Sequence, residues 1–342
     1  MEKMKNMKIA FTGPNTAEYI SAELKNMEKN DVLVKTCVST ISCGTEKANI
    51  TGDPNCSPCT SSEISWPRVL GYSSAGIVLK KGAGVSGIEI GDRVAMSWSQ
   101  HKKYNVLSAD NVVKLPDDIS FAEGAICHIC TFPIAAIRKT RLEMGESLMV
   151  MGLGTLGFLA VQFAKAAGAV PVIAVDPIKE RREAALKFGA DYAFDPFEAD
   201  FADKVKSVTD GGVNAAVEVT GIGAGLNETL DCMAKFGRVS LLGCTRDKNF
   251  TVDYYRKVHG PGITLIGAHT MARPEFESHP GWFTKNDDMK TAIKLAHAGR
   301  IDLKSIIDET HTPQECAEVY KRLVNDKNFP AIVQFDWTKE ES

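Results

Sequence analysis

The sequence predicts an α/β fold with two domains, one rich in β-strands and one built on a doubly wound parallel sheet. Its 342 residues are enough for two domains. Before residue 120, short apolar runs are divided by Gly, Pro, Asn and Asp, which is typical of a β-rich domain. After about residue 129, apolar runs alternate with helical stretches, which predicts parallel strands joined by crossover helices.

The individual elements follow from the same patterns. The β-rich part includes expected strands at 31–38, 74–79 and 93–95. The second part has six apolar runs that we expect to be strands, with helices such as 177–188 and 224–234 between them: 148–151, 172–175, 192–194, 215–218, 239–242 and 264–267. Helices at 287–298 and 313–325 and a strand at 331–335 are expected in the last part of the chain.

Residues 146–176 have the layout of a dinucleotide-binding unit: a strand, three spaced glycines, a helix and a second strand. Gly152 closes the turn after the first strand, Gly154 lets the backbone approach a pyrophosphate, and Gly157 lets the helix lie close to the sheet. The N-terminus of that helix favours a diphosphate through its N–H groups and its positive dipole end. The alternative is a glycine-rich turn without a ligand.

Asp176 ends the second strand of this unit. A carboxylate at that position accepts hydrogen bonds from both hydroxyls of the adenosine ribose and repels a 2′-phosphate. The sequence therefore favours NAD(H) over NADP(H), although the nearby Arg181 and Arg182 leave NADP(H) open.

Composition and charge exclude several function classes. Hydrophobic residues make up 44% of the chain and charged residues 24%, as in ordinary globular proteins. A formal net charge of −3 predicts no binding of nucleic acid or anionic membrane. The first residues contain no signal-peptide core, so we expect a cytoplasmic protein whose nine cysteines are reduced.

This order of elements, with the string GVSGIEIGDRVAM at 84–96, resembles the medium-chain dehydrogenase/reductase superfamily, which includes zinc alcohol and polyol dehydrogenases. The segments 41–47, 70–76 and 262–288 are similar to its threonine-dehydrogenase-like branch. The resemblance implies a GroES-like catalytic domain over 1–128 and 270–342 and a Rossmann NAD-binding domain over 129–269. It also implies hydride transfer to or from a nicotinamide, and a homodimer that pairs through the strand within 263–268.

The resemblance also shows a departure at the metal site of the zinc enzymes. Cys43 matches their first ligand, but Tyr72 stands where the second ligand, a histidine, is expected. The third position falls near Cys127 or His128. A phenol is a poor replacement for imidazole as a zinc ligand, so we expect an active site without zinc. The four cysteines of the structural-zinc lobe are absent too, and the pairs Cys56/Cys59 and Cys127/Cys130 are too far apart in sequence for a zinc ribbon.

Side chains would then handle the hydroxyl proton. The resemblance places Thr45 at a proton-relay position and makes Tyr72, His101 and His128 the acid/base candidates. Glu46 matches an acidic residue that orients a group of the pocket in the zinc enzymes. Each has a structural alternative: Thr45 as a turn residue, Tyr72 as a plug of the vacated metal site, and each histidine as a packed side chain. Cys43, Trp98 and His269 are expected to line the substrate pocket. The motif and the resemblance together assign cofactor contacts to Gly152, Gly154, Thr155, Leu156, Gly157, Asp176, Arg181, Val219, Thr220, Gly243, Gly267 and Ala268.

Three functions are consistent with these residues. The first is an NAD-dependent dehydrogenase that oxidises a secondary alcohol of a small polar substrate of the polyol, sugar or cyclitol type, or reduces the ketone. The second is a zinc-free quinone or enoyl-type reductase, against which Asp176 argues because such enzymes prefer NADPH. The third is a protein that binds the cofactor without catalysis, since fold alone does not establish activity.

Overall fold

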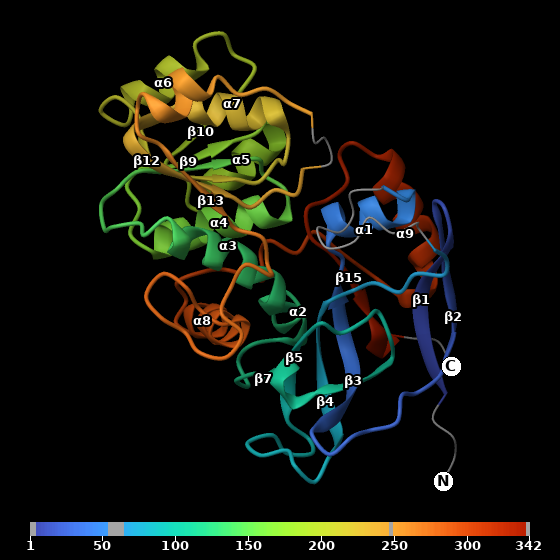
Figure 1. Cartoon of the computed structure of the whole chain (residues 1–342). Coiled ribbons are helices and arrows are strands. Elements are labelled where there is room, and N and C mark those ends of the chain that lie inside the picture. The colour runs from blue at the N-terminus through green and yellow to red at the C-terminus, as the bar shows by residue number, and fades with distance from the viewer. Residues whose placement is uncertain (1–4, 54–64, 246–248, 340–342) are drawn as a thin grey trace. The chain divides into compact units, whose positions relative to one another are not determined.

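The computed structural model describes residues 5–53, 65–245 and 249–339. The chain divides into two compact units (Figure 1). The first unit comprises residues 1–129, 289–297 and 303–342, and the second comprises 130–288 and 298–302. Cys56 and Cys59 lie outside the described residues.

The first unit is rich in β-structure, as expected. A seven-stranded sheet has the order β14-β15-β3-β4-β5-β7, with β6 paired to β3, and β1 and β2 form a separate hairpin. The strands are β1 (Asn6–Gly13), β2 (Thr16–Ala22), β3 (Asp31–Thr40), β4 (Ser73–Lys81), β5 (Arg93–Ser97), β6 (Tyr104–Ser108), β7 (Val112–Lys114), β14 (Glu309–His311) and β15 (Val333–Asp336). The helices are α1 (Cys43–Thr51), α2 (Phe121–Gly124) and α9 (Cys316–Asn325). One apolar core joins both ends of the chain, because Ile9, Ile41, Tyr320 and Trp337 belong to the same cluster.

The second unit contains a parallel sheet with the order β10-β9-β8-β11-β12-β13. Its strands are β8 (Leu148–Met151), β9 (Val172–Val175), β10 (Tyr192–Phe194), β11 (Val213–Glu218), β12 (Met233–Leu241) and β13 (Thr264–Gly267). The crossover helices are α4 (Thr155–Ala166), α5 (Lys179–Lys187), α6 (Phe201–Ser207) and α7 (Gly223–Asp231). Figure 1 shows the sheet between α4 and α7. Strands β8 and β9 are buried along their whole length, which explains why their sequences are continuous apolar runs.

The helices α3 (Cys127–Lys139) and α8 (Lys285–His297) each contribute residues to both units. Residues 270–288, which the sequence analysis assigns to the catalytic domain, make their contacts in the second unit. Arg273 explains this placement, because its guanidinium donates to Thr131 O at 3.1 Å and pairs with Asp288.

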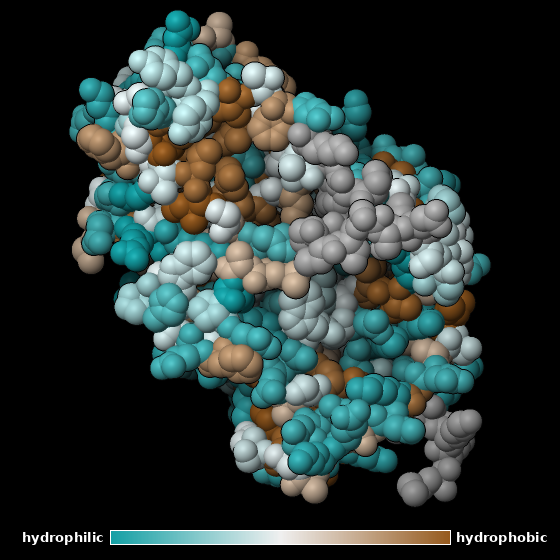
Figure 2. Space-filling view, in the orientation of Figure 1, coloured by the Kyte–Doolittle hydropathy of each residue, from teal (hydrophilic) through white to brown (hydrophobic). Residues whose placement is uncertain are grey.

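The surface is hydrophilic over much of the face in Figure 2, with a group of apolar side chains over the strands of the second unit. Strand β13 ends the sheet, and Leu265 on it is 39% exposed. Among the described residues, no helix combines the length and the apolar character that crossing a membrane requires.

Candidate functional site

The glycine-rich turn of the second unit has the geometry of a phosphate cradle. Gly152 follows β8 with φ of 100°, a conformation that L side chains rarely adopt. A Cβ on Gly157 would lie 2.0 Å from Gly152 O, so only glycine allows the helix to pack against the turn. A Cβ on Gly154 would meet no atom within 4 Å, which leaves room for a ligand against its backbone.

The twelve-residue helix α4 begins directly after this turn. Gly154 is its N-cap and offers no side-chain cap bond. The first N–H groups of a helix, here those of Thr155, Leu156 and Gly157, have no carbonyl partner within the helix itself. A helix N-terminus of this kind binds a diphosphate through its N–H groups and its dipole. The residues present therefore fit the pyrophosphate of a dinucleotide cofactor.

Asp176 lies at the end of β9, next to this turn, and is 4% exposed. Its Oδ2 accepts a hydrogen bond from Leu153 N at 2.8 Å, and its Oδ1 accepts one from Ile178 N at 2.8 Å. Each carboxylate oxygen has a second lone pair for a ribose hydroxyl. The carboxylate thus fixes the turn and offers acceptors at the ribose position.

The two arginines near Asp176 differ in their contacts. Arg182 Nη1 donates to Asp176 O, to Pro177 O and to Asp195 Oδ2, at 2.8, 2.9 and 3.1 Å. Arg181 Nη1 lies 3.8 Å from Asp176 Oδ2. Both guanidinium groups are engaged by acidic partners of the same unit.

The ends of β11 and β12 form the next part of this edge. Thr220 packs against Gly152, since its Cγ2 would lie 2.9 Å from a Cβ there, and a Cβ on Gly243 would lie 2.8 Å from Val219 O. Glu218, which the sequence analysis did not single out, accepts from Thr220 N at 2.7 Å and Gly221 N at 3.1 Å. Burial raises the pKa of this carboxyl group. Glu218 therefore holds the loop on which Val219 and Thr220 lie.

The end of β13 carries a lysine contact that the sequence analysis missed. Lys139 Nζ donates to Gly267 O at 3.1 Å and lies 4.7 Å from the centre of the Trp282 ring. Burial and the charge of Arg273 lower the pKa of Lys139 to about 8. His269 is half-buried, and burial and the nearby Lys139 lower its pKa. Ala268, between Gly267 and His269 in the sequence, is buried.

In the first unit, Tyr72, Trp98 and His128 form an aromatic cluster. The ring centres of Tyr72 and His128 are 5.5 Å apart, those of Trp98 and His128 are 4.8 Å apart, and those of Tyr72 and Trp98 are 6.0 Å apart. His128 Nδ1 hydrogen-bonds to Tyr72 O at 2.6 Å, and the Tyr72 hydroxyl hydrogen-bonds to the Ser42 hydroxyl. The structure therefore brings together three residues that the sequence analysis assigned to one pocket.

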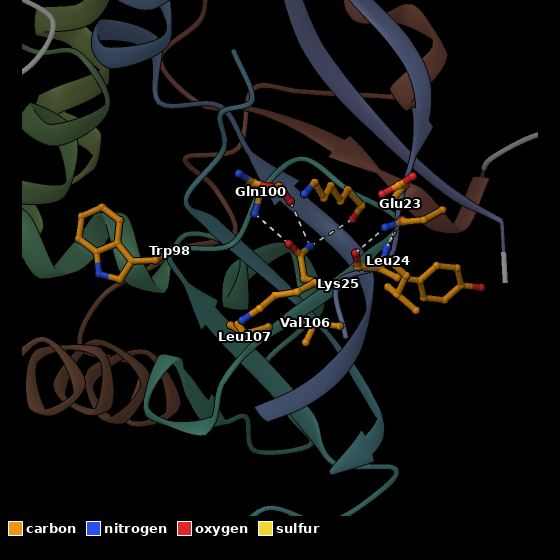
Figure 3. A pocket seen from close by; sticks show the side chains of 11 residues that line it. Glu23, Leu24, Lys25, Trp98, Gln100, Val106 and Leu107 are labelled. Atoms are coloured by element: carbon orange, nitrogen blue, oxygen red, sulfur yellow. Dashed lines mark hydrogen bonds between the residues drawn. The ribbon is translucent and has the colours of Figure 1, made fainter. Parts of the chain in front are cut away.

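Trp98 has an unusual backbone, with φ of 55°, and its side chain is half-exposed. Bulky residues in the left-handed region are rare and are found at functional sites. A polar surface pocket lies next to it, lined by residues that include Asn6, Lys25, Gln100 and Lys102. Figure 3 shows the Trp98 indole apart from the other labelled residues of that pocket.

His101 belongs to a different, fully buried network. Its Nε2 lies 3.2 Å from Glu46 Oε2, and its Nδ1 lies 2.7 Å from Ser39 Oγ, which accepts from Trp337 Nε1 at 2.9 Å. The Tyr320 hydroxyl also donates to Glu46 Oε2, and burial together with Glu46 raises the pKa of Tyr320 well above its usual value. Glu46 is 0% and His101 is 1% exposed, so these two residues form part of the buried interior and have a structural role.

Thr45 and Cys43 lie in the first turn of α1 and are half-buried. Thr45 O accepts from Asn49 Nδ2 at 2.8 Å, and Cys43 Sγ lies 3.5 Å from Ala331 O. Cys127 and Cys130 are fully buried, and burial raises the pKa of Cys127 to about 12. Within residues 5–53, 65–245 and 249–339, no three His, Cys, Asp or Glu side chains are arranged to hold a metal ion.

Comparisons with known proteins agree with this arrangement. An alcohol dehydrogenase GroES-like domain matches residues 28–139, and a zinc-binding dehydrogenase domain matches residues 155–284. The L-threonine 3-dehydrogenase of Pyrococcus horikoshii is 30% identical over 320 residues, which cover 85% of this chain and 87% of that protein. The chain belongs to the medium-chain, zinc-type alcohol dehydrogenase superfamily.

Other relatives of this medium-chain dehydrogenase include the sorbitol dehydrogenase of Bacillus subtilis, 25% identical over 296 residues that cover 78% of the chain and 80% of that protein. Galactitol-1-phosphate dehydrogenase from Escherichia coli has the same fold, with a TM-score of 0.82 at 20% identity over 97% of this chain and 100% of that one. The protein is thus an alcohol-type, nicotinamide-dependent oxidoreductase with a GroES-like domain and a Rossmann domain.

Proposed function

We propose that this medium-chain dehydrogenase uses NAD(H) to oxidise a secondary alcohol of a polyol, sugar or cyclitol, or to reduce the corresponding ketone, without catalytic zinc. The observation that carries the cofactor choice is Asp176, a buried carboxylate at the end of β9 beside the phosphate cradle. A 2′-phosphate there would meet its negative charge. Arg182 is held by Asp176 O and Asp195, which leaves it poorly placed to compensate.

The donor set supports the zinc-free part of the proposal. A catalytic zinc site needs three protein ligands, usually thiolate, imidazole or carboxylate. Here Tyr72 occupies one of the three positions, and its phenol is hydrogen-bonded to Ser42. The residues present therefore do not fit the zinc site of the superfamily.

The second unit would bind the cofactor through the Gly152–Gly157 turn, Asp176 and Arg181, with Val219, Thr220, Gly243, Gly267 and Ala268 beside the riboses and the nicotinamide. The nicotinamide, when bound, accepts or returns the hydride. In the first unit Tyr72, with Trp98 and His128 around it, would receive the hydroxyl proton. Polyol-type substrates are supported by the sorbitol dehydrogenase relative.

We also propose a homodimer that pairs through β13. This strand ends the sheet, contains no proline and exposes Leu265, and an open apolar edge of this kind favours pairing with a second copy.

A substrate screen with metal analysis tests the function. The purified protein is analysed for metals and then assayed for reduction of NAD⁺ and NADP⁺ with polyols, glycosides and cyclitols, and for reduction of quinones and enones. We expect no stoichiometric zinc, activity that a chelator leaves unchanged, and NAD⁺-dependent oxidation of a polyhydroxylated alcohol. One tightly held zinc ion per chain, or activity with quinones alone, contradicts the proposal.

Comparison of Tyr72→Phe, His101→Ala and His128→Ala tests the acid/base assignment. Loss of a general acid/base costs about 10²–10⁴-fold in rate, so Tyr72→Phe should lower kcat in that range while NAD⁺ affinity is retained. His101→Ala should act mainly through stability because it empties a buried, hydrogen-bonded site. If all three variants keep kcat within about threefold of the parent, the assignment is wrong.

A further inference from the structure

We propose that Ser42 is the positioning residue that makes Tyr72 the catalytic base: its hydroxyl donates a hydrogen bond to the Tyr72 phenolate, and the phenolate takes the hydroxyl proton of the alcohol. This inference rests on the proposed function for its chemistry. It rests on the structure for the Ser42–Tyr72 pair.

The first observation is an N-cap serine whose side chain does not cap its helix. Ser42 occupies the N-cap of α1 without a side-chain cap bond. Serine is favoured at this position because its hydroxyl accepts from the first N–H groups of the helix. In this protein the hydroxyl is bonded to the Tyr72 phenol instead. The side chain is therefore used for Tyr72 at the expense of a helix cap.

The second observation is that Glu46 fixes the Ser42 backbone on both sides. Ser42 N donates to Glu46 Oε1 at 2.9 Å, and Ser42 O accepts from Glu46 N at 2.8 Å. Glu46 is itself held by His101 and Tyr320 and is 0% exposed. The buried network thus holds the Ser42 hydroxyl at a fixed place against Tyr72, which is the preorganisation that a catalytic hydrogen bond requires.

The third observation separates Tyr72 from the two histidines. Tyr72 is half-buried, whereas His128 is 0% and His101 is 1% exposed. The Tyr72 backbone is fixed by His128, and its ring lies against Trp98 and His128. Among the described residues, two side chains that could affect the ionisation of Tyr72 contact it. The ring of His128 packs against the Tyr72 ring, and the Ser42 hydroxyl is hydrogen-bonded to the phenol. Of the three acid/base candidates, Tyr72 is therefore the one that a substrate can reach.

The O–H bond of the alcohol breaks and its proton goes to the Tyr72 phenolate oxygen, while the electrons of that bond form the carbonyl. The C–H bond breaks and its electron pair leaves with the hydrogen to the nicotinamide, which the dehydrogenase activity supplies. Ser42 donates to the phenolate before the transfer and can accept from the phenol after it, because a hydroxyl group both donates and accepts.

Titration of Tyr72 tests the pair without any substrate. Protein labelled at tyrosine Cζ is titrated by NMR, and the Tyr72 signal is assigned by its loss in Tyr72→Phe. A hydrogen bond that favours the charged form lowers a pKa, so Tyr72 should titrate below the ordinary value of about 10. Ser42→Ala should raise the pKa of Tyr72 by about 1 to 2, and Ser42→Thr, which keeps the hydroxyl, should restore it.

Ser120→Ala is the matched control. Ser120 is the N-cap of α2, where its side chain accepts from Glu123 N, so this variant removes a capping serine away from Tyr72. It should leave the pKa of Tyr72 unchanged. In steady-state kinetics Ser42→Ala should shift the acid limb of the pH profile of kcat to higher pH, with little change in KM, as expected for a positioning residue.

Two outcomes overturn the proposal: a Tyr72 that titrates at or above about 10 in the parent protein, or a Tyr72 pKa that is the same in Ser42→Ala and the parent. The first can be read even when the Ser42 variants do not fold. A shifted Tyr72 pKa in a protein that oxidises no alcohol refutes the proposed function and leaves the Ser42–Tyr72 pair intact, so the two failures are distinguishable.

Discussion

We expect Asp176 to set the cofactor preference through a single charge. Asp176→Ala should weaken NAD(H) binding and narrow or reverse the preference over NADP(H), because it removes the ribose acceptor and the repulsion of a 2′-phosphate together. Calorimetry with both cofactors measures the two affinities. Tighter binding of NADP(H) than of NAD(H) by the unmodified protein contradicts the role given to Asp176.

Gly157 and Gly154 offer a matched pair of substitutions in one turn. Gly157→Ala places a methyl group 2.0 Å from a backbone oxygen, so it should destabilise the protein by about 1–3 kcal/mol, as overpacking does, and weaken cofactor binding. Gly154→Ala meets no atom within 4 Å, so it should keep the parent's stability and lose only cofactor affinity. Urea unfolding and calorimetry separate the two effects. Equal stability of both variants would show that the close approach at Gly157 is unimportant.

The conformation of the glycine-rich turn could be predicted because its signal is local. Gly152, Gly154, Gly157 and Asp176 lie within one βαβ unit, and the positive φ of Gly152 and the close backbone approach at Gly157 follow from their places in that unit. The sequence left open whether His101 is an acid/base group or a packed side chain, because its partners Ser39 and Glu46 are distant in sequence and Ser39 is joined to Trp337 across a separation of 298 residues. Ser42 was missed for a different reason: its hydroxyl is used for a residue 30 positions away and not for its own helix.

At the scale of elements, Glu309 on β14 joins this strand to α9. Arg322 on α9 donates two hydrogen bonds to the Glu309 carboxylate, both at 2.9 Å, and His311 lies 2.8 Å from it. The hydrogen bonds from Arg322 hold the pKa of Glu309 down at about 2. A carboxyl group whose pKa is depressed in the folded state stabilises the protein above its unfolded pKa.

Glu309→Gln should therefore lower the free energy of unfolding at pH 7 by about 1–2 kcal/mol, a value reduced for solvent screening. The difference from the parent should shrink as the pH falls from about 4.5 towards about 2, where the parent's own carboxylate becomes protonated. Urea unfolding at several pH values measures it. Glu318→Gln on α9 is the control, because the pair of Glu318 with Lys321 is exposed and long, at 3.9 Å. A pH-independent difference for Glu309→Gln would argue against the ion pair.

The elements themselves were predictable to different degrees. Strands β8, β9, β10 and β13 have the expected bounds because each is a short run of apolar or aromatic residues closed by turn residues. Strand β12 begins at Met233, earlier than the expected 239. Its first part pairs with β11 at Val213 and includes exposed residues, so its sequence is not a continuous apolar run. Helix α1 was not predicted, since its sequence has no apolar periodicity and it is held by Glu46.

For the whole molecule, the proposed dimer predicts a clear effect at β13. Leu265→Lys should convert a dimer into a monomer at micromolar concentration, because a charge on the apolar edge opposes pairing with a second copy. Sedimentation of the parent and the variant measures this, with Met144→Lys, an exposed apolar residue outside β13, as the control. A monomeric parent would remove the basis for the prediction.

The two units also differ in when the ribosome supplies their parts. Strands β8 to β13 are consecutive between residues 148 and 267, so the cofactor-binding sheet can form while synthesis continues. Strand β3 must wait for β15, and Glu46 must wait for Tyr320, 274 positions later. During that interval only the end of β3 at residues 38–40 lacks its strand partner, because β4 and β6 already pair with the rest of β3. We therefore expect the part of the protein that is encoded first, with the Ser42–Tyr72 pair, to be the part that matures last.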